Sequence, residues 1–361
     1  MYEAPFLRRI VAGVVTTFCM AHACAQDTPS RNVGERQALH AEINADLTAS
    51  EKRDPNLVVL KRLLAQPEES IDLAKAEVAV EKMIDPAVDG QATLQALDDL
   101  ARAIKARFPK GDATDQEAKI GILLNSLKFA GPWNDNRPFR YDLDNPMGDN
   151  PRDKLLSSYL ATRKGNCVSM PMLFVVLSQK LGIDATLSNA PTHLFARARI
   201  NDGSWYNIEA TSFGTISDLH YQQQLGITPR ALQTGIYLQT LTKKQDILMM
   251  VDTLEQFYRH HRSPDELLGL TMLVLTTDDK NVSGWIWRGD AYGELIDNKF
   301  IKKYGAVEKI PPAEQGNYAI LQTNNLDMFR RAEALGWVEE TEKHKADYLK
   351  SIQQVKAQQG G

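Results

Sequence analysis

The feature that most constrains the fold is the segment VSMPMLFVVLSQKL, residues 168–181, which is apolar on almost every side. A helix that is hydrophobic all round must be buried all round, so we expect this segment to be the central helix of a layered core. Pro171 is compatible with a helix because it falls in the first turn. Gly182 marks the end of the helix.

Short strands are predicted directly after this helix. Residues 185–191, 193–200 and 205–211 have the composition and patterning of strands, and residues 201–204 (NDGS) are typical of a turn. The last two strands should therefore form an antiparallel hairpin. The expected fold class is α+β, with a central buried helix packed on a small antiparallel sheet and an all-α region after it.

The rest of the chain is predicted to be mostly helical. Apolar residues at helical spacing and capping signals indicate helices over 71–84 (capped by Ser70), 90–108, 115–129 and 155–161, with a long polar loop over 131–153. The expected organisation is a polar, partly helical lead over 26–68, a core domain over 69–215 and a helical domain over 216–361.

The first 25 residues have the pattern of an export signal. An arginine pair precedes an apolar stretch, residues 10–21, that is too short to span a bilayer, and ACA at 23–25 fits the small-x-small cleavage pattern. We therefore expect cleavage near Ala25 and a periplasmic or secreted protein. Lipidation at Cys24 is the alternative, which His22 disfavours because a small or apolar residue is expected there.

Cleavage would leave Cys167 as the only cysteine, in an oxidising compartment. A single exported cysteine is an intermolecular disulfide partner, a buried inert thiol or a reactive thiol. Cys167 directly precedes the central helix, where the helix dipole favours a thiolate. A nucleophilic cysteine also needs a neighbouring base and a third group that orients the base.

His193 and Glu209 are the candidates for these two partners. His193 begins one strand of the hairpin, Glu209 lies near the end of the next, and both are eight residues from Asn201. A hairpin centred on Asn201 brings the two side chains face to face if its loop has an odd number of residues. A three- or five-residue loop with Gly203 at positive φ meets this condition. Taken singly, His193 could make a structural hydrogen bond and Glu209 could pair with Arg197.

Two segments, GNCVSMPMLFVVLSQKLGIDA and THLFARARINDGSWYNIEAT, resemble the core of the transglutaminase-like superfamily. The resemblance covers residues 165–211 and fills all three triad positions. The chain departs from the family pattern in having Glu209 where Asp is usual and IEAT where DPT is common. DLAKAEVAVEKMIDP and LLNSLKFAGPWND resemble the SirB-type branch, which pairs this core with C-terminal tetratricopeptide-like helices.

The resemblance implies a papain/transglutaminase-like fold and a cysteine hydrolase or acyltransferase acting on a peptide or protein substrate. Cys167 would attack a carbonyl to form a thioester, His193 would move the proton and Glu209 would orient the imidazole. Water or an amine would then accept the acyl group, and the sequence leaves open which. The N–H of the cysteine would be one oxyanion donor, and the candidates for a second are Asn166, Trp133 and Tyr141.

Composition and motifs narrow the function classes. The net charge of −4 gives no electrostatic footprint for nucleic acid, and no apolar run is long enough to predict a membrane span. The sequence contains no zinc signature and no glycine-rich phosphate loop, so we expect no metal and no cofactor.

The helical region after residue 216 contains a partial tetratricopeptide pattern. Trp285, Gly289 and Tyr292 fit the start of such a repeat, with Arg288 in place of the usual Leu. This region could bind a protein partner. The alternative to an enzyme is therefore a non-catalytic periplasmic scaffold that binds a partner through these helices.

Overall fold

The computed structural model describes residues 49–109 and 114–341, together with residues 346, 349–350 and 353. The predicted signal segment, with Cys24 and the cleavage point near Ala25, lies outside the described residues. In the described part of the chain, no helix is both long and apolar enough to cross a membrane.

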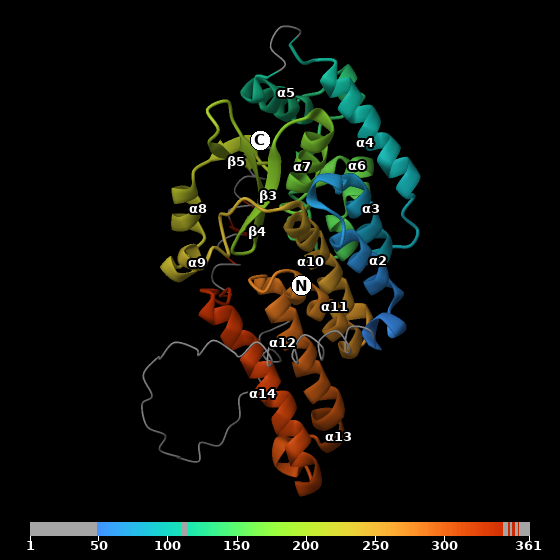
Figure 1. Cartoon of the computed structure of the whole chain (residues 1–361), viewed down its shortest axis with the longest axis vertical. Coiled ribbons are helices and arrows are strands. Elements are labelled where there is room, and N and C mark those ends of the chain that lie inside the picture. Colours follow the sequence, from blue (N-terminus) through green and yellow to red (C-terminus); the bar gives the residue numbers. More distant parts are fainter. Residues whose placement is uncertain (1–48, 110–113, 342–345, 347–348, 351–352, 354–361) are drawn as a thin grey trace.

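The central helix is α7, Ser169–Leu181, and it lies in the middle of the molecule (Figure 1). Its first ten residues are all buried, as the all-round apolar sequence predicts. Gly182 ends the helix in the left-handed conformation with φ of 69°. Helices surround α7 on the side away from the sheet: α3 (Leu73–Ile84), α4 (Gly90–Lys105), α5 (Gln116–Lys128) and α6 (Leu156–Thr162).

The sheet that α7 packs on has four antiparallel strands in the order β3-β4-β5-β6. These strands are β3 (Ala185–Ala190), β4 (His193–Arg199), β5 (Trp205–Glu209) and β6 (Gly214–Ile216). The three predicted strands are thus confirmed, and β6 is an additional short strand. The molecule is an α+β fold with a central helix, a small antiparallel sheet and a helical region, as expected.

Aspartate side chains cap the upstream helices. Asp72, Asp89 and Asp115 accept hydrogen bonds from the first turns of α3, α4 and α5. The prediction of Ser70 as a cap was wrong, because Ser70 ends the short 3-10 helix Glu68–Ser70. Within the N-terminal lead, the structure describes α2, Pro55–Leu64.

The long polar segment over 131–153 contains short elements. These are the 3-10 helices Pro132–Asn134 and Pro151–Lys154 and the strand β1, Arg140–Tyr141. β1 pairs in parallel with β2, Lys164–Gly165, and a hydrogen bond of 2.7 Å joins Asp142 N to Gly165 O. This segment is therefore attached to the backbone directly before Cys167.

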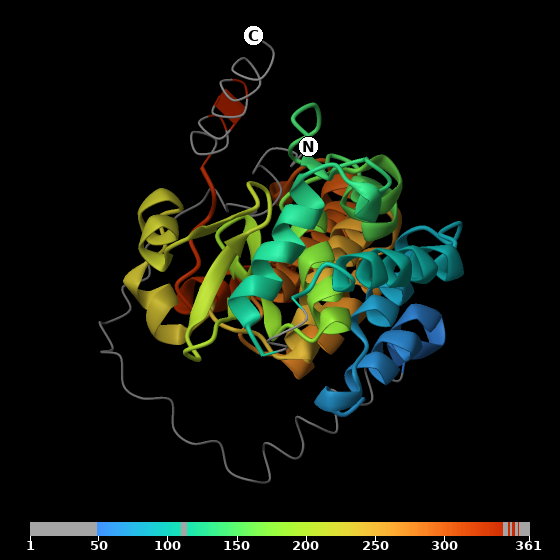
Figure 2. The same ribbon diagram turned by 90° about the horizontal axis from the view of Figure 1, so that it is seen from above.

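After the sheet the chain is helical. The elements are α8 (Asp218–Gln224), α9 (Pro229–Thr234), α10 (Lys243–His261), α11 (Pro264–Thr277), α12 (Val282–Ile296), a π-helix (Asp297–Ile301), α13 (Lys302–Tyr304), a 3-10 helix (Val307–Lys309) and α14 (Pro312–Ala334). α12 and α14 lie side by side and extend away from the sheet (Figure 1). Seen from above, the sheet lies between α8 and α9 on one side and the helices around α7 on the other (Figure 2). Gly289 permits the close approach of α12 and α14, because a Cβ there would lie 2.8 Å from Phe329 Cε2. The tetratricopeptide interpretation of this region stays a prediction.

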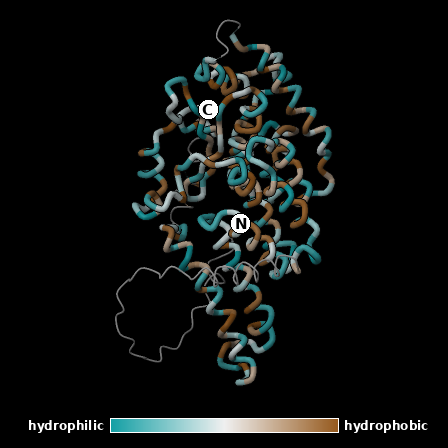
Figure 3. Tube along the Cα trace, viewed as in Figure 1, coloured by the Kyte–Doolittle hydropathy of each residue, from teal (hydrophilic) through white to brown (hydrophobic). Residues whose placement is uncertain are grey.

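One hydrophobic core joins the sheet region to the first C-terminal helices. It extends from Leu57 of α2 to Ala291 of α12, and apolar segments line the interior in Figure 3. Buried Asp246 of α10 accepts hydrogen bonds of 2.9 Å from Thr186 Oγ1 and Leu187 N of β3. Burial raises the pKa of Asp246 to about 8. The domain boundary expected at residue 215 stays a prediction, and this core crosses it.

Candidate active site

Cys167 lies in a capped turn that leads into α7. Asn166 Oδ1 accepts hydrogen bonds from Val168 N at 3.0 Å and Ser169 N at 3.2 Å, while Asn166 N donates to Ser169 Oγ. Met170 N donates to Asn166 O, which is the first helix-type bond of this segment. Asn166 is therefore the functional cap, and Cys167 occupies the first turn, where the helix dipole favours negative charge.

Gly165 is required by the close packing before the cysteine. A Cβ on Gly165 would lie 2.7 Å from two ring carbons of Tyr159 and 2.8 Å from Ser169 Oγ. Distances under 3.0 Å force neighbouring atoms to move, so any larger residue would displace the capped turn. Tyr159 is itself buried and packs edge-on against Phe139, which makes a shift costly.

A tight turn places His193 at the start of β4. Ala190 pairs with His193, so only Pro191 and Thr192 connect β3 to β4. Thr192 has a φ of 56°, a left-handed conformation that is uncommon for a β-branched residue. The side chain of His193 is 19% exposed.

The β4–β5 hairpin determines the relation between His193 and Glu209. Arg199 pairs with Trp205, and Ile200 N donates to Ser204 O, so the loop has three residues, with Gly203 at a φ of 87°. This loop meets the condition under which His193 and Glu209 share a face, an odd loop with Gly203 at positive φ. The predicted centre at Asn201 was wrong by one residue, because the register is centred on position 202. Glu209 is therefore diagonal to His193 on the same face rather than directly opposite.

The longer side chain of Glu spans this diagonal. Glu209 Oε2 lies 2.7 Å from His193 Nε2. The side chain of Cys167 lies close enough to the His193 ring to raise the pKa of the imidazole. Since Nε2 is hydrogen-bonded to the carboxylate, Nδ1 is the ring nitrogen left for the thiol. The structure thus brings Cys167, His193 and Glu209 together in one group.

The electrostatic surroundings of His193 and Glu209 favour the charged form of both side chains. Burial lowers the pKa of His193, but hydrogen bonds to Cys167 and Glu209 and the nearby negative charge outweigh it and raise this pKa to about 10. Burial raises the pKa of Glu209, but hydrogen bonding to His193, its positive charge, and hydrogen bonds from Thr211 and Tyr221 lower it to about 2. At neutral pH the pair is an imidazolium and a carboxylate.

Two residues that the sequence did not reveal complete the surroundings of Glu209. Tyr221 Oη donates to Glu209 Oε2 at 2.7 Å. Thr211 donates to Glu209 Oε1 through its hydroxyl at 2.5 Å and its N–H at 3.1 Å. Thr211 lies in the IEAT motif, two residues after Glu209, and this short separation in sequence could have indicated its contact with the carboxylate. Tyr221 lies in a short helix with no pattern that points to the site.

The three candidates for a second oxyanion donor are differently placed. The Asn166 side chain is engaged, since Oδ1 accepts the capping bonds and Nδ2 donates to Asp153 O. Trp133 Nε1 donates to Ser126 O. Tyr141 pairs with Gly165 near the cysteine, and its hydroxyl donates to Pro146 O. Cys167 N–H has no acceptor among the described residues.

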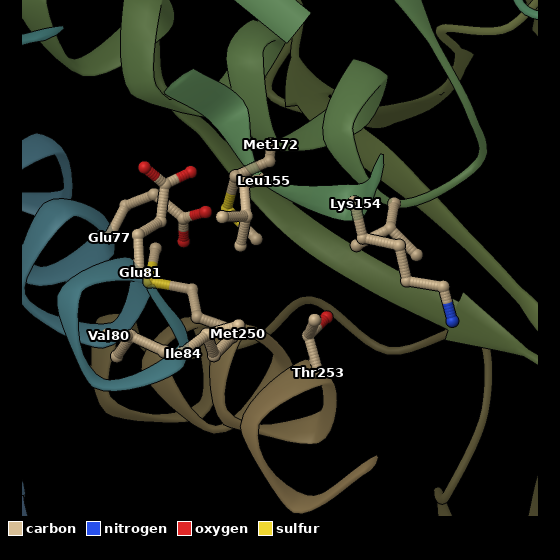
Figure 4. Close-up of a pocket in the computed structure, with 10 residues that line it drawn as sticks. Glu77, Val80, Glu81, Ile84, Lys154, Leu155, Met172, Met250 and Thr253 are labelled. Atoms are coloured by element: carbon tan, nitrogen blue, oxygen red, sulfur yellow. The ribbon is translucent and has the colours of Figure 1, made fainter. Parts of the chain in front are cut away.

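A small cavity lies beside the first turn of α7 (Figure 4). Its volume of about 10 Å³ is that of roughly one water molecule. The carboxyl groups of Glu77 and Glu81 lie next to each other on one wall, and each has one buried oxygen without a hydrogen-bond partner. Burial raises the pKa of both groups. The remaining lining residues are Val80, Ile84, Lys154, Leu155, Val168, Met172, Met250 and Thr253.

Residues 91–252 match the family model of the transglutaminase-like superfamily. The match begins in α4, includes α7 and the whole sheet, and ends in α10. This segment is thus similar to the transglutaminase-like superfamily, and the candidate triad lies within it. No curated protein and no solved structure matches the chain.

The residues that the structure describes contain no cluster of three or more His, Cys, Asp or Glu side chains that could hold a metal ion.

Proposed function

We propose that the protein is an exported cysteine hydrolase or acyltransferase that acts on peptide or amide bonds through Cys167, His193 and Glu209. The observation that carries the proposal is the hydrogen bond between the imidazole of His193 and the buried carboxylate of Glu209, with the thiol of Cys167 close enough to influence the same ring. A scaffold protein, the alternative class, would need no such connection. The transglutaminase-like domain supports cysteine-dependent chemistry.

The proposed reaction begins from the thiolate–imidazolium pair. The Cys167 thiolate attacks the carbonyl carbon, an S–C bond forms, and the carbonyl electrons move to oxygen. When the carbonyl reforms, the C–N bond breaks and His193 gives its proton to the departing amine. The products of this half-reaction are a free amine and a thioester on the cysteine, with a neutral imidazole beside it.

The second half-reaction restores the enzyme. His193 removes a proton from water or an amine as the oxygen or nitrogen attacks the thioester. The C–S bond breaks, and the thiolate and imidazolium are regenerated with release of an acid or a new amide. Water is the proposed acceptor, since it needs no second binding site. Glu209 keeps the imidazole in one orientation and stabilises its charge.

The oxyanion is proposed to bind at the start of α7. The unengaged N–H of Cys167 is the donor nearest to the reacting carbon, and the helix dipole adds positive potential there. Asn166 would act on this donor indirectly, by capping the turn that holds it. This is a different role from the direct donation that the sequence suggested for Asn166.

The experiment that tests the proposal is capture of the acyl-enzyme. The protein is incubated with p-nitrophenyl acetate and with peptide p-nitroanilides, quenched in acid, and weighed by intact-mass spectrometry. A mass increase equal to the acyl group, mapped to Cys167 and absent in Cys167→Ser and His193→Ala, is expected. Acylation that persists in Cys167→Ser, or never occurs in a folded protein that hydrolyses none of the probes, contradicts the proposal.

The compartment is a separate part of the proposal. The N-terminal pattern with cleavage near Ala25 supports export to the periplasm or beyond. N-terminal sequencing of the protein recovered from cell fractions tests it. A start near Gln26 in the periplasmic fraction is expected, whereas an intact N-terminus in the cytoplasmic fraction contradicts it.

A further inference from the structure

We propose that Tyr221 and Thr211 are positioning residues that hold Glu209 charged and directed at His193. The inference rests on the proposed function, because a positioned carboxylate matters only if the imidazole works on the thiol. Neither residue touches the reacting atoms in this account. Their effect is exerted through Glu209.

The hydrogen bonds divide evenly between the two carboxylate oxygens. Oε2 accepts from His193 Nε2 and Tyr221 Oη, both at 2.7 Å, and Oε1 accepts from the hydroxyl and N–H of Thr211. A carboxylate offers about four acceptor positions, so all of them are used. Glu has one more rotatable bond than Asp, and its side chain is 7% exposed here. These donors remove the freedom that the longer side chain would otherwise have.

The ring of Tyr221 is fixed by aromatic packing. Tyr221 is 3% exposed and stacks on Phe195 with ring centroids 4.4 Å apart, and its centroid lies 5.7 Å from that of His193. Phe195 is the residue opposite Glu209 in the register of the sheet. The phenol therefore covers the same face on which the carboxylate and the imidazole meet.

Short-range polar contacts hold the helix that carries Tyr221. Ser217 caps α8, and Asp218 in its first turn accepts a hydrogen bond of 2.6 Å from Asn207 Nδ2 of β5. Arg197 of β4 forms an ion pair with Asp218 at 3.3 Å. α8 is thus attached to the two strands that carry His193 and Glu209, which keeps Oη in register with the carboxylate.

The test replaces only the hydroxyl groups. Tyr221→Phe keeps the stacked ring, Thr211→Val keeps the shape of the side chain, and Thr211→Ser keeps the donor. Tyr237→Phe is the matched control, because Tyr237 is a buried tyrosine of the same hydrophobic cluster whose pKa is raised by burial alone, to about 12. Two readouts are used on each full-length variant: the ¹⁵N NMR titration of His193 and the iodoacetamide alkylation rate of Cys167 at pH 6.

The expected result is a lower titration midpoint for His193 in Tyr221→Phe and in Thr211→Val, by about one pH unit each. One unit corresponds to a tenfold change in the balance between the two protonation states of His193 near its midpoint. At pH 6, well below the midpoint in each of these variants, alkylation of Cys167 should stay close to the wild-type rate. Thr211→Ser and Tyr237→Phe should match the wild type. A merely structural role would not move the His193 midpoint in a folded variant.

The variant His193→Ala distinguishes a failure of the positioning role from a failure of the proposed function. If His193→Ala slows alkylation while the His193 midpoints of Tyr221→Phe and Thr211→Val match that of the control, the positioning role is overturned and the proposed function stands. If His193→Ala leaves alkylation unchanged, the proposed function itself fails. If one of the two hydroxyl variants does not fold, the other still tests the role, because the two act on different oxygens of Glu209.

Discussion

Glu209→Gln tests how the carboxylate sets the charge on His193. With a pKa of about 10, nearly all of His193 is imidazolium at pH 7. Without the carboxylate, burial still lowers this pKa and only the contribution of Cys167 opposes it, so the midpoint should fall well below that of the wild type. For a midpoint at the ordinary value of 6.5, about a quarter of His193 would be charged at pH 7. The fraction of thiolate–imidazolium pairs should fall with it.

The same substitution should also destabilise the fold. A Gln side chain retains one acceptor oxygen, and its NH₂ group faces two of the four donors that now reach Glu209. Losing two hydrogen bonds to a charged group costs about 3–6 kcal/mol, at about 1.5–3 kcal/mol each. Urea unfolding gives the stability, and NMR gives the His193 midpoint. Glu294→Gln, which removes a partly exposed ion pair with Arg259, is the control and should leave the His193 midpoint in place. A His193 midpoint that is the same in Glu209→Gln and the wild type refutes the reasoning.

Three further outcomes follow from buried charge and packing. The stability difference between wild type and Glu209→Gln should be largest between pH 4.5 and 6.5. It should shrink as the pH falls toward 2 or rises toward 10, because the Glu209 carboxylate has a lowered pKa and the His193 imidazole a raised one. A stability difference that does not change with pH in urea titrations contradicts this. Glu77→Met should stabilise the protein by about 1–3 kcal/mol at pH 8 and by less at pH 5. Burial raises the Glu77 pKa, so ionisation of the buried carboxyl group costs stability as the pH rises. An equal gain in stability at both pH values would show that the charge of Glu77 is not the cause. Gly289→Ala should lower stability by about 1–3 kcal/mol through contact with Phe329, whereas Gly316→Ala, which meets nothing within 4 Å in α14, should raise it by about 0.5–1 kcal/mol; thermal unfolding of the pair distinguishes packing from helix propensity.

The central helix and the hairpin could be predicted from sequence because their signals are local. A segment apolar on every side is stable only in the interior of the protein, and the spacing of His193 and Glu209 about the turn puts them on one face if the loop is odd. The sequence left open whether the loop is odd, and the three-residue loop of the structure meets the condition. The predicted centre was one residue too early, since a centre at 201 and a centre at 202 both give an odd loop.

Other parts of the site depend on contacts between distant segments. Tyr221 reaches Glu209 only because α8 packs across the sheet, and a seven-residue helix has no periodicity that reveals which face it buries. The strands β1, β2 and β6 have two or three residues each, too few for an alternating pattern. Asn is a preferred residue at the start of a helix, so the sequence was also compatible with a capping role for Asn166. Its position beside Cys167 led instead to the prediction of an oxyanion donor.

The most direct test of the account is the pH dependence of Cys167 alkylation by iodoacetamide in the wild type and in His193→Ala. The account predicts that Cys167 reacts more slowly in His193→Ala than in the wild type, with the largest loss of rate at the acidic end of the profile. Identical profiles for the two proteins, both rising only in the range of a free thiol near pH 8.5, would contradict the central claim that Cys167 and His193 act as a pair.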